Sequence, residues 1–186
     1  SSKFYNINKR MARNKLGISE NLFIVAFVGS FIKRKGIQIL SAALDEFDDV
    51  YSFFIGKGDI EPNCNNILYK GSMQNEQIYL YLNAADLFVL PTQAEGCCNA
   101  IIEAMACGLP IISSNKAFND DILNKNNSIR IDEKNIDELK NAILTLKNNS
   151  ILRGEMSTAS INSALKLDIK KRAKDIIKFI ESKKQK

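Results

Sequence analysis

The strongest constraint on the fold is a regular alternation of short apolar stretches with segments that have helical periodicity. The apolar stretches are rich in Ile, Val, Leu and Phe, as expected for strands buried on both faces. They occupy residues 21–28, 51–55, 66–70, 86–90, 111–114 and 128–131. Strands that alternate with helices are typical of a parallel sheet covered on both sides. We therefore predict an α/β fold with a doubly wound, mostly parallel Rossmann-like sheet, in a single domain spanning residues 1–186.

The segments between the strands predict helices, because their apolar residues recur every three or four positions. The predicted helices occupy residues 9–16, 75–85, 100–107, 116–124, 135–147, 151–165 and 168–182, and one more begins after Gly36. Gly108 fits the position just past a helix end, with Pro110 beyond it. The sequence contains no internal repeat and no low-complexity linker.

The composition is that of an ordinary globular protein, with 45% apolar and 25% charged residues. No apolar run approaches the roughly 20 residues that a membrane-spanning helix needs. The chain opens with Ser1 and Ser2 rather than methionine and carries no visible secretion signal. We therefore expect a piece of a longer cytoplasmic protein.

The net charge of +5 comes from the C-terminal end. After Leu165, nine Lys and Arg minus three Asp and Glu give +6, which leaves −1 for the rest of the chain. This distribution argues against a nucleic-acid surface. Asp168 is a plausible N-cap for the predicted helix over 168–182, whose lysines lie opposite one apolar stripe. Two interpretations stay open: a helix docked on its own domain, which we favour, or a helix lying on a membrane surface.

The four cysteines show no C-x-x-C spacing, and the chain has no histidine. We expect free thiols and no metal site at Cys64, Cys97, Cys98 and Cys107. Cys97 near a helix start suggests a nucleophile, but no histidine base exists to activate it. Packing is the better explanation.

The segment from Glu95 to Pro110 is the first candidate site. Pro91 ends the strand over 86–90, and the loop that follows leads into the helix over 100–107. Ligands bind at the carboxyl ends of parallel strands, so we expect Glu95 and Glu103 to face one crevice. The unpaired N–H groups at the helix start favour an anion such as phosphate. The residues concerned are Gly96, Cys97, Cys98 and Asn99.

The second candidate site follows the first strand. Gly29 and Ser30 lead to Lys33, Arg34 and Lys35, three cations placed before a helix, where its dipole disfavours positive charge. An anion bound there would relieve this conflict. A run of this kind standing alone is more often a solvated turn.

Together these segments resemble the retaining glycosyltransferases of family 4, which have the GT-B fold. Glu95 and Glu103 match the family's E-x7-E segment, and Arg34 and Lys35 match the basic pair of its G-x-x-x-x-(R/K)-K-G element. The resemblance covers residues 27–147. It implies the C-terminal, nucleotide-sugar-binding domain of such an enzyme.

The resemblance also implies roles for individual residues. Arg34 and Lys35 would hold the donor diphosphate, Glu95 the hydroxyls of the donor sugar, and Glu103 the hydroxyls of the ribose. Gly56 matches the family's glycine turn after the second strand. Met73 lies in the loop that contacts the nucleotide base, although methionine is also a common gap filler.

For the whole enzyme, the resemblance implies transfer of a hexose from a nucleotide sugar, with retention of configuration, in bacterial polysaccharide or glycolipid synthesis. Neither a metal nor another cofactor is expected. The acceptor would be bound by an N-terminal domain absent from these residues, toward which residues 150–186 would pack. A lipid-linked acceptor would place the enzyme at the inner face of the membrane. The chain alone should bind donor better than it turns over.

Two departures and two alternatives accompany this interpretation. Ser30 stands where many members have a basic residue, and Cys97 and Cys98 stand where many have Phe-Gly. The chain could instead be a non-catalytic nucleotide-binding module, or a GT-B nucleotide-sugar epimerase. The lack of histidine counts mildly against the epimerase, which needs acid–base residues.

Overall fold

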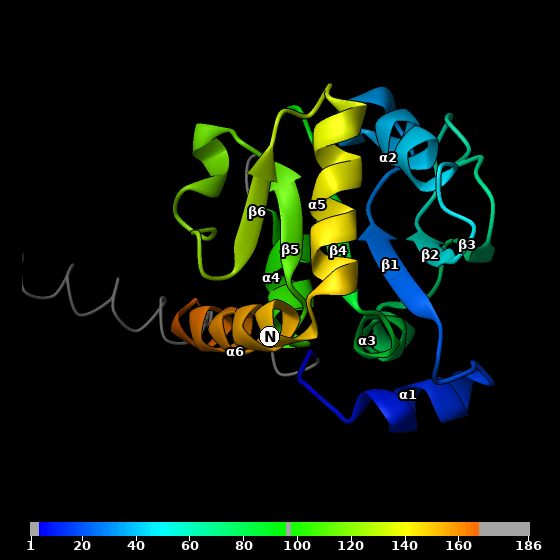
Figure 1. Cartoon of the computed structure of the whole chain (residues 1–186), viewed down its shortest axis with the longest axis vertical. Helices are drawn as coiled ribbons and strands as arrows, with labels where there is room; N and C mark the ends of the chain where they lie inside the picture. Colours follow the sequence, from blue (N-terminus) through cyan, green and yellow to red (C-terminus); the bar gives the residue numbers. More distant parts are fainter. Residues whose placement is uncertain (1–3, 96–97, 168–186) are drawn as a thin grey trace, which may run out of the picture.

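Six parallel strands form one sheet at the centre of the molecule (Figure 1). The computed structural model describes residues 4–95 and 98–167. The strands are β1 (Phe23–Val28), β2 (Val50–Ile55), β3 (Ile67–Gly71), β4 (Leu87–Leu90), β5 (Ile111–Ser114) and β6 (Ser128–Ile131). Their order is β3-β2-β1-β4-β5-β6, and every pairing between them is parallel. The predicted doubly wound parallel sheet is confirmed.

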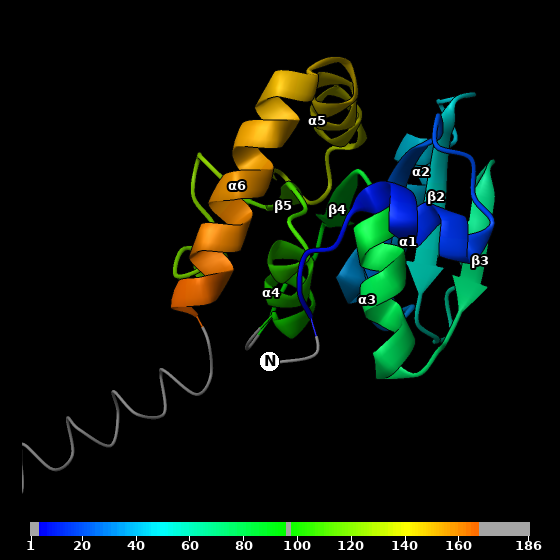
Figure 2. The same cartoon turned by 90° about the horizontal axis from the view of Figure 1, so that it is seen from below.

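The helices form layers on both faces of this sheet. They are α1 (Lys9–Leu16), α2 (Ile37–Leu44), α3 (Asn75–Ala84), α4 (Asn99–Ala106), α5 (Ile136–Asn148) and α6 (Ser150–Lys166), with short 3₁₀ turns η1 (Lys33–Lys35) and η2 (Ala117–Asn119). α2 and α5 pack together on one face, and α3 and α4 lie on the other. Figure 2 shows α1 beside α3 and α6 beside α4. The predicted helix over 168–182 lies outside the described residues.

The predicted helix over 116–124 is wrong, because only the 3₁₀ turn η2 forms there. The reason is that asparagine side chains bind the backbone in place of helical hydrogen bonds. The Asn119 amide donates to Ser114 O at 3.0 Å, and the Asn127 amide donates to Ile122 O at 3.2 Å. The segment is thus an ordered loop after β5.

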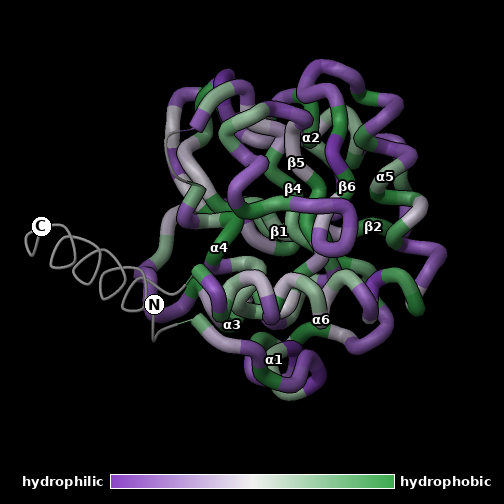
Figure 3. The backbone as a smooth tube through the Cα atoms, turned by 90° about the vertical axis from the view of Figure 1, so that its left-hand side faces the viewer, coloured by the Kyte–Doolittle hydropathy of each residue, from purple (hydrophilic) through white to green (hydrophobic). Residues whose placement is uncertain are grey.

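The core lies between the sheet and its two helix layers. Phe27, Phe53, Phe54 and Phe88 on the strands are fully buried. Figure 3 shows the hydrophobic colour concentrated in the central strands and the hydrophilic colour in the outer loops. No helix within the described part of the chain has the length and apolar character needed to span a bilayer.

A buried carboxylate, Asp86, organises the edge of the sheet where the strands begin. Its Oδ2 accepts hydrogen bonds from the Arg13 guanidinium at 2.8 Å and from Ile24 N at 2.7 Å. Its Oδ1 accepts from the Lys9 ammonium at 2.6 Å. The side chains of Arg13 and Asp86 are only 3% and 8% exposed. Each buried charge therefore needs the other as its counter-charge. This cluster fastens α1 to the starts of β1 and β4.

Asp86→Asn should lower the free energy of unfolding by about 3 kcal/mol, because the buried Arg13 guanidinium loses its counter-charge. Urea denaturation of the two proteins measures the difference. The matched control is Asp120→Asn, which removes a 67% exposed carboxylate that lies 3.1 Å from Arg130. Exposed pairs contribute at most about 1 kcal/mol. A loss no larger than that of the control would contradict a structural role for Asp86.

Candidate functional site

The loops after β1, β2 and β3 meet at the carboxyl edge of the sheet. The β1–β2 register pairs Val28 with Ile55, so Gly29 and Gly56 leave the sheet side by side. Gly29 N donates a hydrogen bond to Ile55 O at 3.0 Å, and Gly56 N donates to Gly71 O at 2.9 Å. These bonds continue the hydrogen-bond pattern of the sheet one residue past the strands. The first residues of the loops therefore stay aligned with the sheet.

The close approach of these loops requires glycine at position 56. Its φ is +153°, and a Cβ added there would lie 1.9 Å from Gly29 O. Any side chain would therefore push the loops after β1 and β2 apart. Gly56 is needed for the shape of this edge, which explains the glycine turn that the sequence predicts.

A cavity of about 230 Å³ opens above these loops. Its lining combines apolar strand ends with polar loop residues, and includes four residues predicted to bind the donor. The lining residues are Val28, Gly29, Ser30, Ile55, Gly56, Lys57, Ser72, Met73 and Ile78. The structure thus brings together Gly29, Ser30, Gly56 and Met73, which come from three different loops. A partly apolar cleft with a few polar groups is the usual form of a small-molecule site.

An ion pair joins η1 to the loop between β4 and α4. The Lys35 ammonium contacts Glu95 Oε1, and the two side chains are 15% and 9% exposed. A Cβ added to Gly29 would lie 3.8 Å from Lys35 Cδ, so the lysine stem passes beside the cavity. Arg34 reinforces the junction: its side chain donates to Ala94 O and its carbonyl accepts from Gln93 N. The predicted catalytic residues Arg34, Lys35 and Glu95 therefore lie together.

Thr92 lies at the centre of this junction, and the sequence analysis did not single it out. Its hydroxyl oxygen is 3.0 Å from Glu95 Oε1 and 3.2 Å from Arg34 O. The side chain is fully buried. One signal was available in the sequence: a polar residue follows Pro91 directly, at the carboxyl end of a predicted strand.

Helix α4 starts at the same edge of the sheet, as predicted. Cys98 precedes its first residue, Asn99, and no acidic residue occupies its first turn. Cys98 is buried and Asn99 is exposed. The positive end of the helix dipole thus points toward the edge that carries Lys35. Gly96 and Cys97, also predicted to contribute backbone donors, lie outside the described residues.

Glu103 is a half-buried carboxylate one turn into α4. Among residues 4–95 and 98–167, no side chain or backbone group pairs with this carboxylate, and burial alone raises its pKa. Its negative charge also helps to raise the pKa of the Cys107 thiol. Glu103 therefore lies on the Cys107 side of the helix. A half-buried carboxylate with a raised pKa that pairs with no described protein group is a candidate ligand contact.

The described cysteines act as packing residues. Cys64, Cys98 and Cys107 are thiols outside any disulfide, as predicted, and Cys97 lies outside the described residues. Burial raises the pKa of Cys64 to about 11 and that of Cys107 to about 12, so both thiols are protonated at neutral pH. Across the described ranges, 4–95 and 98–167, no three His, Cys, Asp or Glu side chains are grouped to hold a metal.

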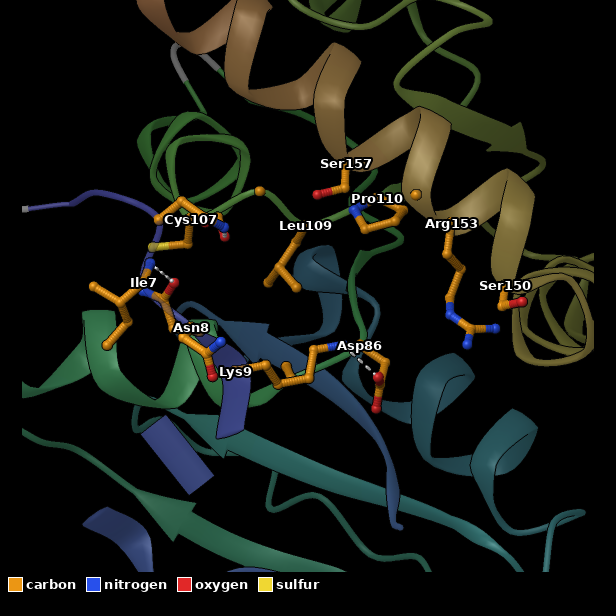
Figure 4. A pocket seen from close by; sticks show the side chains of 15 residues that line it. Ile7, Asn8, Lys9, Asp86, Cys107, Leu109, Pro110, Ser150, Arg153 and Ser157 are labelled. Atoms are coloured by element: carbon orange, nitrogen blue, oxygen red, sulfur yellow. Dashed lines mark hydrogen bonds and ion pairs between the residues drawn. The ribbon is translucent and has the colours of Figure 1, made fainter. Parts of the chain in front are cut away.

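A second cavity, of about 370 Å³, lies at the opposite, amino edge of the sheet. Figure 4 shows Arg153 and Ser157 on the α6 side of this cavity, and Lys9 and Asp86 across from them. Most of its polar side chains are used within the protein: Lys9 binds Asp86, Asn83 accepts from Ile7 N at 2.8 Å, and Arg153 donates to Lys147 O at 2.8 Å. The polar side chains around this cavity thus serve to hold α1 and α6 in place. The carboxyl edge remains the stronger candidate.

Several proteins are similar to this chain in sequence. Over 152 residues it is 30% identical to TuaC of Bacillus subtilis, a glycosyltransferase named for teichuronic acid biosynthesis, covering 80% of this chain and 39% of TuaC. A Methanocaldococcus jannaschii glycosyltransferase is 26% identical over 160 residues, covering 80% of this chain and 44% of that protein. The chain thus spans less than half the length of these two relatives.

Solved structures share the fold. Sucrose-phosphate synthase of Thermosynechococcus elongatus superimposes with a TM-score of 0.87 at 22% identity, over 97% of this chain and 50% of that one. Anabaena HepE, in complex with UDP and glucose, gives 0.83 at 20% identity, over 97% and 54%. The family model for glycosyl transferases group 1 matches residues 8–163. Because that match covers most of the chain, the protein belongs to the group 1 glycosyltransferases.

Proposed function

We propose that this chain is the donor-binding half of an enzyme that transfers a sugar from a nucleoside diphosphate sugar, with retention of configuration. One observation carries the proposal. The basic residues Arg34 and Lys35 and the carboxylate Glu95 are held together at the carboxyl edge, beside the cavity lined by Gly29 and Gly56. Cations next to a cleft of about 230 Å³ suit a diphosphate joined to a base and a sugar.

The diphosphate would lie between the two cations and the start of α4. As the bond between the anomeric carbon and the phosphate oxygen breaks, negative charge develops on the leaving diphosphate. Arg34, Lys35 and the positive end of the α4 dipole would surround that position, and they would stabilise this charge. We propose that these groups do the work that a divalent metal ion does at other diphosphate sites.

The base would occupy the cavity between the loops after β1 and β3, against the half-buried side chain of Met73. Glu103 would accept hydrogen bonds from the ribose hydroxyls. Its carboxylate suits this role because it is half-buried and unpaired among the described residues, so a ligand can supply the donors that the described protein groups do not.

Glu95 would accept hydrogen bonds from the hydroxyls of the transferred sugar. Its ion pair with Lys35 is compatible with ligand binding, because an ammonium has three N–H donors and can contact a phosphate oxygen as well. In this arrangement the same lysine links the leaving diphosphate to the residue that holds the sugar.

The acceptor and the pathway follow from the relatives' names and are part of the proposal. TuaC is named for teichuronic acid biosynthesis, and another relative is a GDP-mannose-dependent phosphatidylinositol monomannoside mannosyltransferase. We propose a hexosyltransferase of polysaccharide or glycolipid synthesis, acting in the cytoplasm at the membrane face on an acceptor bound by a second domain. Residues 150–167 lie on α4 and α5 in this structure, and the predicted contact of residues 150–186 with that second domain stays a prediction.

A nucleoside diphosphate without added metal should stabilise the chain. At a concentration of 100 times the dissociation constant, the free energy of unfolding should rise by about 2.7 kcal/mol. Thermal shift with the diphosphates of uridine, guanosine, adenosine and thymidine, in the presence of EDTA, measures this effect. Arg34→Ala with Lys35→Ala should abolish the shift. Four diphosphates without effect on the wild-type chain would refute the proposed function.

Glu103→Gln should weaken binding of the best nucleoside diphosphate by about tenfold, because the ribose hydroxyls lose a charged acceptor. Calorimetric titration measures the affinity. Inorganic pyrophosphate, which has no ribose, should bind wild type and variant alike. Equal losses for the nucleotide and for pyrophosphate would contradict the ribose assignment.

The same variant has a predicted pH signature. Because burial raises the pKa of Glu103 in the folded chain, the folded protein binds more protons than the unfolded one between the ordinary glutamate pKa of 4.5 and the raised pKa. Stability contributed by this group therefore falls as pH rises through that window. Glu103→Gln should remove this fall and be at least as stable as wild type at pH 7, whereas a capping or ion-paired glutamate would show a loss.

A further inference from the structure

We infer that Thr92 is a positioning residue that sets the direction of the Glu95 carboxylate and so the recognition of the donor's sugar. The inference rests on the proposed function and adds a residue to it. Thr92 lies at the carboxyl end of β4, immediately after Pro91, with its side chain fully buried. It would act only through Glu95, without touching the ligand.

The contacts around Thr92 define this role. Its Oγ1 lies 3.0 Å from Glu95 Oε1 and 3.2 Å from each of the carbonyl oxygens of Arg34 and Ala94. A threonine hydroxyl has one proton, and a bond to a carboxylate is stronger than one to a neutral carbonyl. The hydroxyl therefore donates best to Glu95.

The position of the bond explains why it matters for the sugar. Thr92 and the Lys35 ammonium both bind Oε1 of Glu95. Two contacts on one oxygen fix the rotation of the carboxylate about its last bond, and this rotation decides where Oε2 points. Removal of the Thr92 hydroxyl leaves Lys35 as the one described side chain that binds the carboxylate, so Oε2 no longer has one direction.

A purely structural role for the hydroxyl predicts something else. If Thr92 only closed the junction between η1 and the β4–α4 loop, its loss would lower stability and weaken every ligand of Lys35 equally. The positioning role predicts a selective loss, confined to the part of the binding that depends on Glu95.

The test compares each nucleotide sugar with its own nucleoside diphosphate on the full 186-residue chain. The probes are UDP with UDP-glucose and GDP with GDP-mannose, titrated calorimetrically. Thr92→Val keeps the shape of the side chain without the hydroxyl, and Thr92→Ser keeps the hydroxyl. Should Thr92→Val fail to fold, Thr92→Cys, whose thiol is a weak donor, replaces it. Thr145→Val is the matched control, because Thr145 is exposed and its hydroxyl donates to Asn141 O within α5.

Thr92→Val should weaken binding of the nucleotide sugar by about tenfold and change diphosphate binding less than twofold. Thr92→Ser should restore sugar affinity, and Thr145→Val should change neither. In a Glu95→Gln background, adding Thr92→Val should have no further effect, because the positioned group is gone.

Three results would overturn the inference. Equal losses for diphosphate and nucleotide sugar would show a structural role only. A full loss that persists in the Glu95→Gln background would show that Thr92 acts by another route. Normal sugar binding by Thr92→Val would show that its hydroxyl has no role. Failure of all four nucleoside diphosphates to bind the wild-type chain would instead refute the proposed function, and this inference with it.

Discussion

Parallel strand pairing is the constraint on which the rest of the structure depends. It sends the carboxyl ends of β1, β2, β3 and β4 to one edge, so loops far apart in the sequence emerge side by side. Lys35 and Glu95 are 60 positions apart, yet they form a largely buried ion pair there. A carboxylate and an ammonium are costly to bury singly, so each fixes the other. The parallel direction of the strands thus brings the residues of the site together.

The two edges of the sheet use buried charge for different purposes. At the amino edge, Asp86 is enclosed by Arg13, Lys9 and a backbone N–H, which leaves its oxygens occupied by protein groups. At the carboxyl edge, Glu103 pairs with no group of the described residues and carries a raised pKa from burial. A buried charge paired within the protein stabilises the fold, whereas a half-buried carboxylate without a described protein partner marks a position that a ligand can complete.

Sequence patterns predicted the sheet well because its inner strands are short, buried on both faces and separated by amphipathic helices. They failed over 116–124, where Asn119 and Asn127 bind the backbone through their side chains and prevent a helix. The residues of the site were predicted partly from the family's motifs, but the motifs do not give the reason for Gly56, which is its close approach to Gly29. Thr92 was missed because the junction around its hydroxyl forms only when the folded sheet brings Arg34, 58 positions away, to it.

The central claim is that a nucleoside diphosphate binds at the carboxyl edge and not in the cavity between α1 and α6. Amide chemical shifts of the ¹⁵N-labelled chain, followed during titration with UDP and then GDP, test it directly. The account predicts changes at Gly29, Lys35 and Gly56, with Lys9 and Arg153 unchanged. Changes confined to Lys9, Arg153 and their neighbours at the amino edge would contradict it.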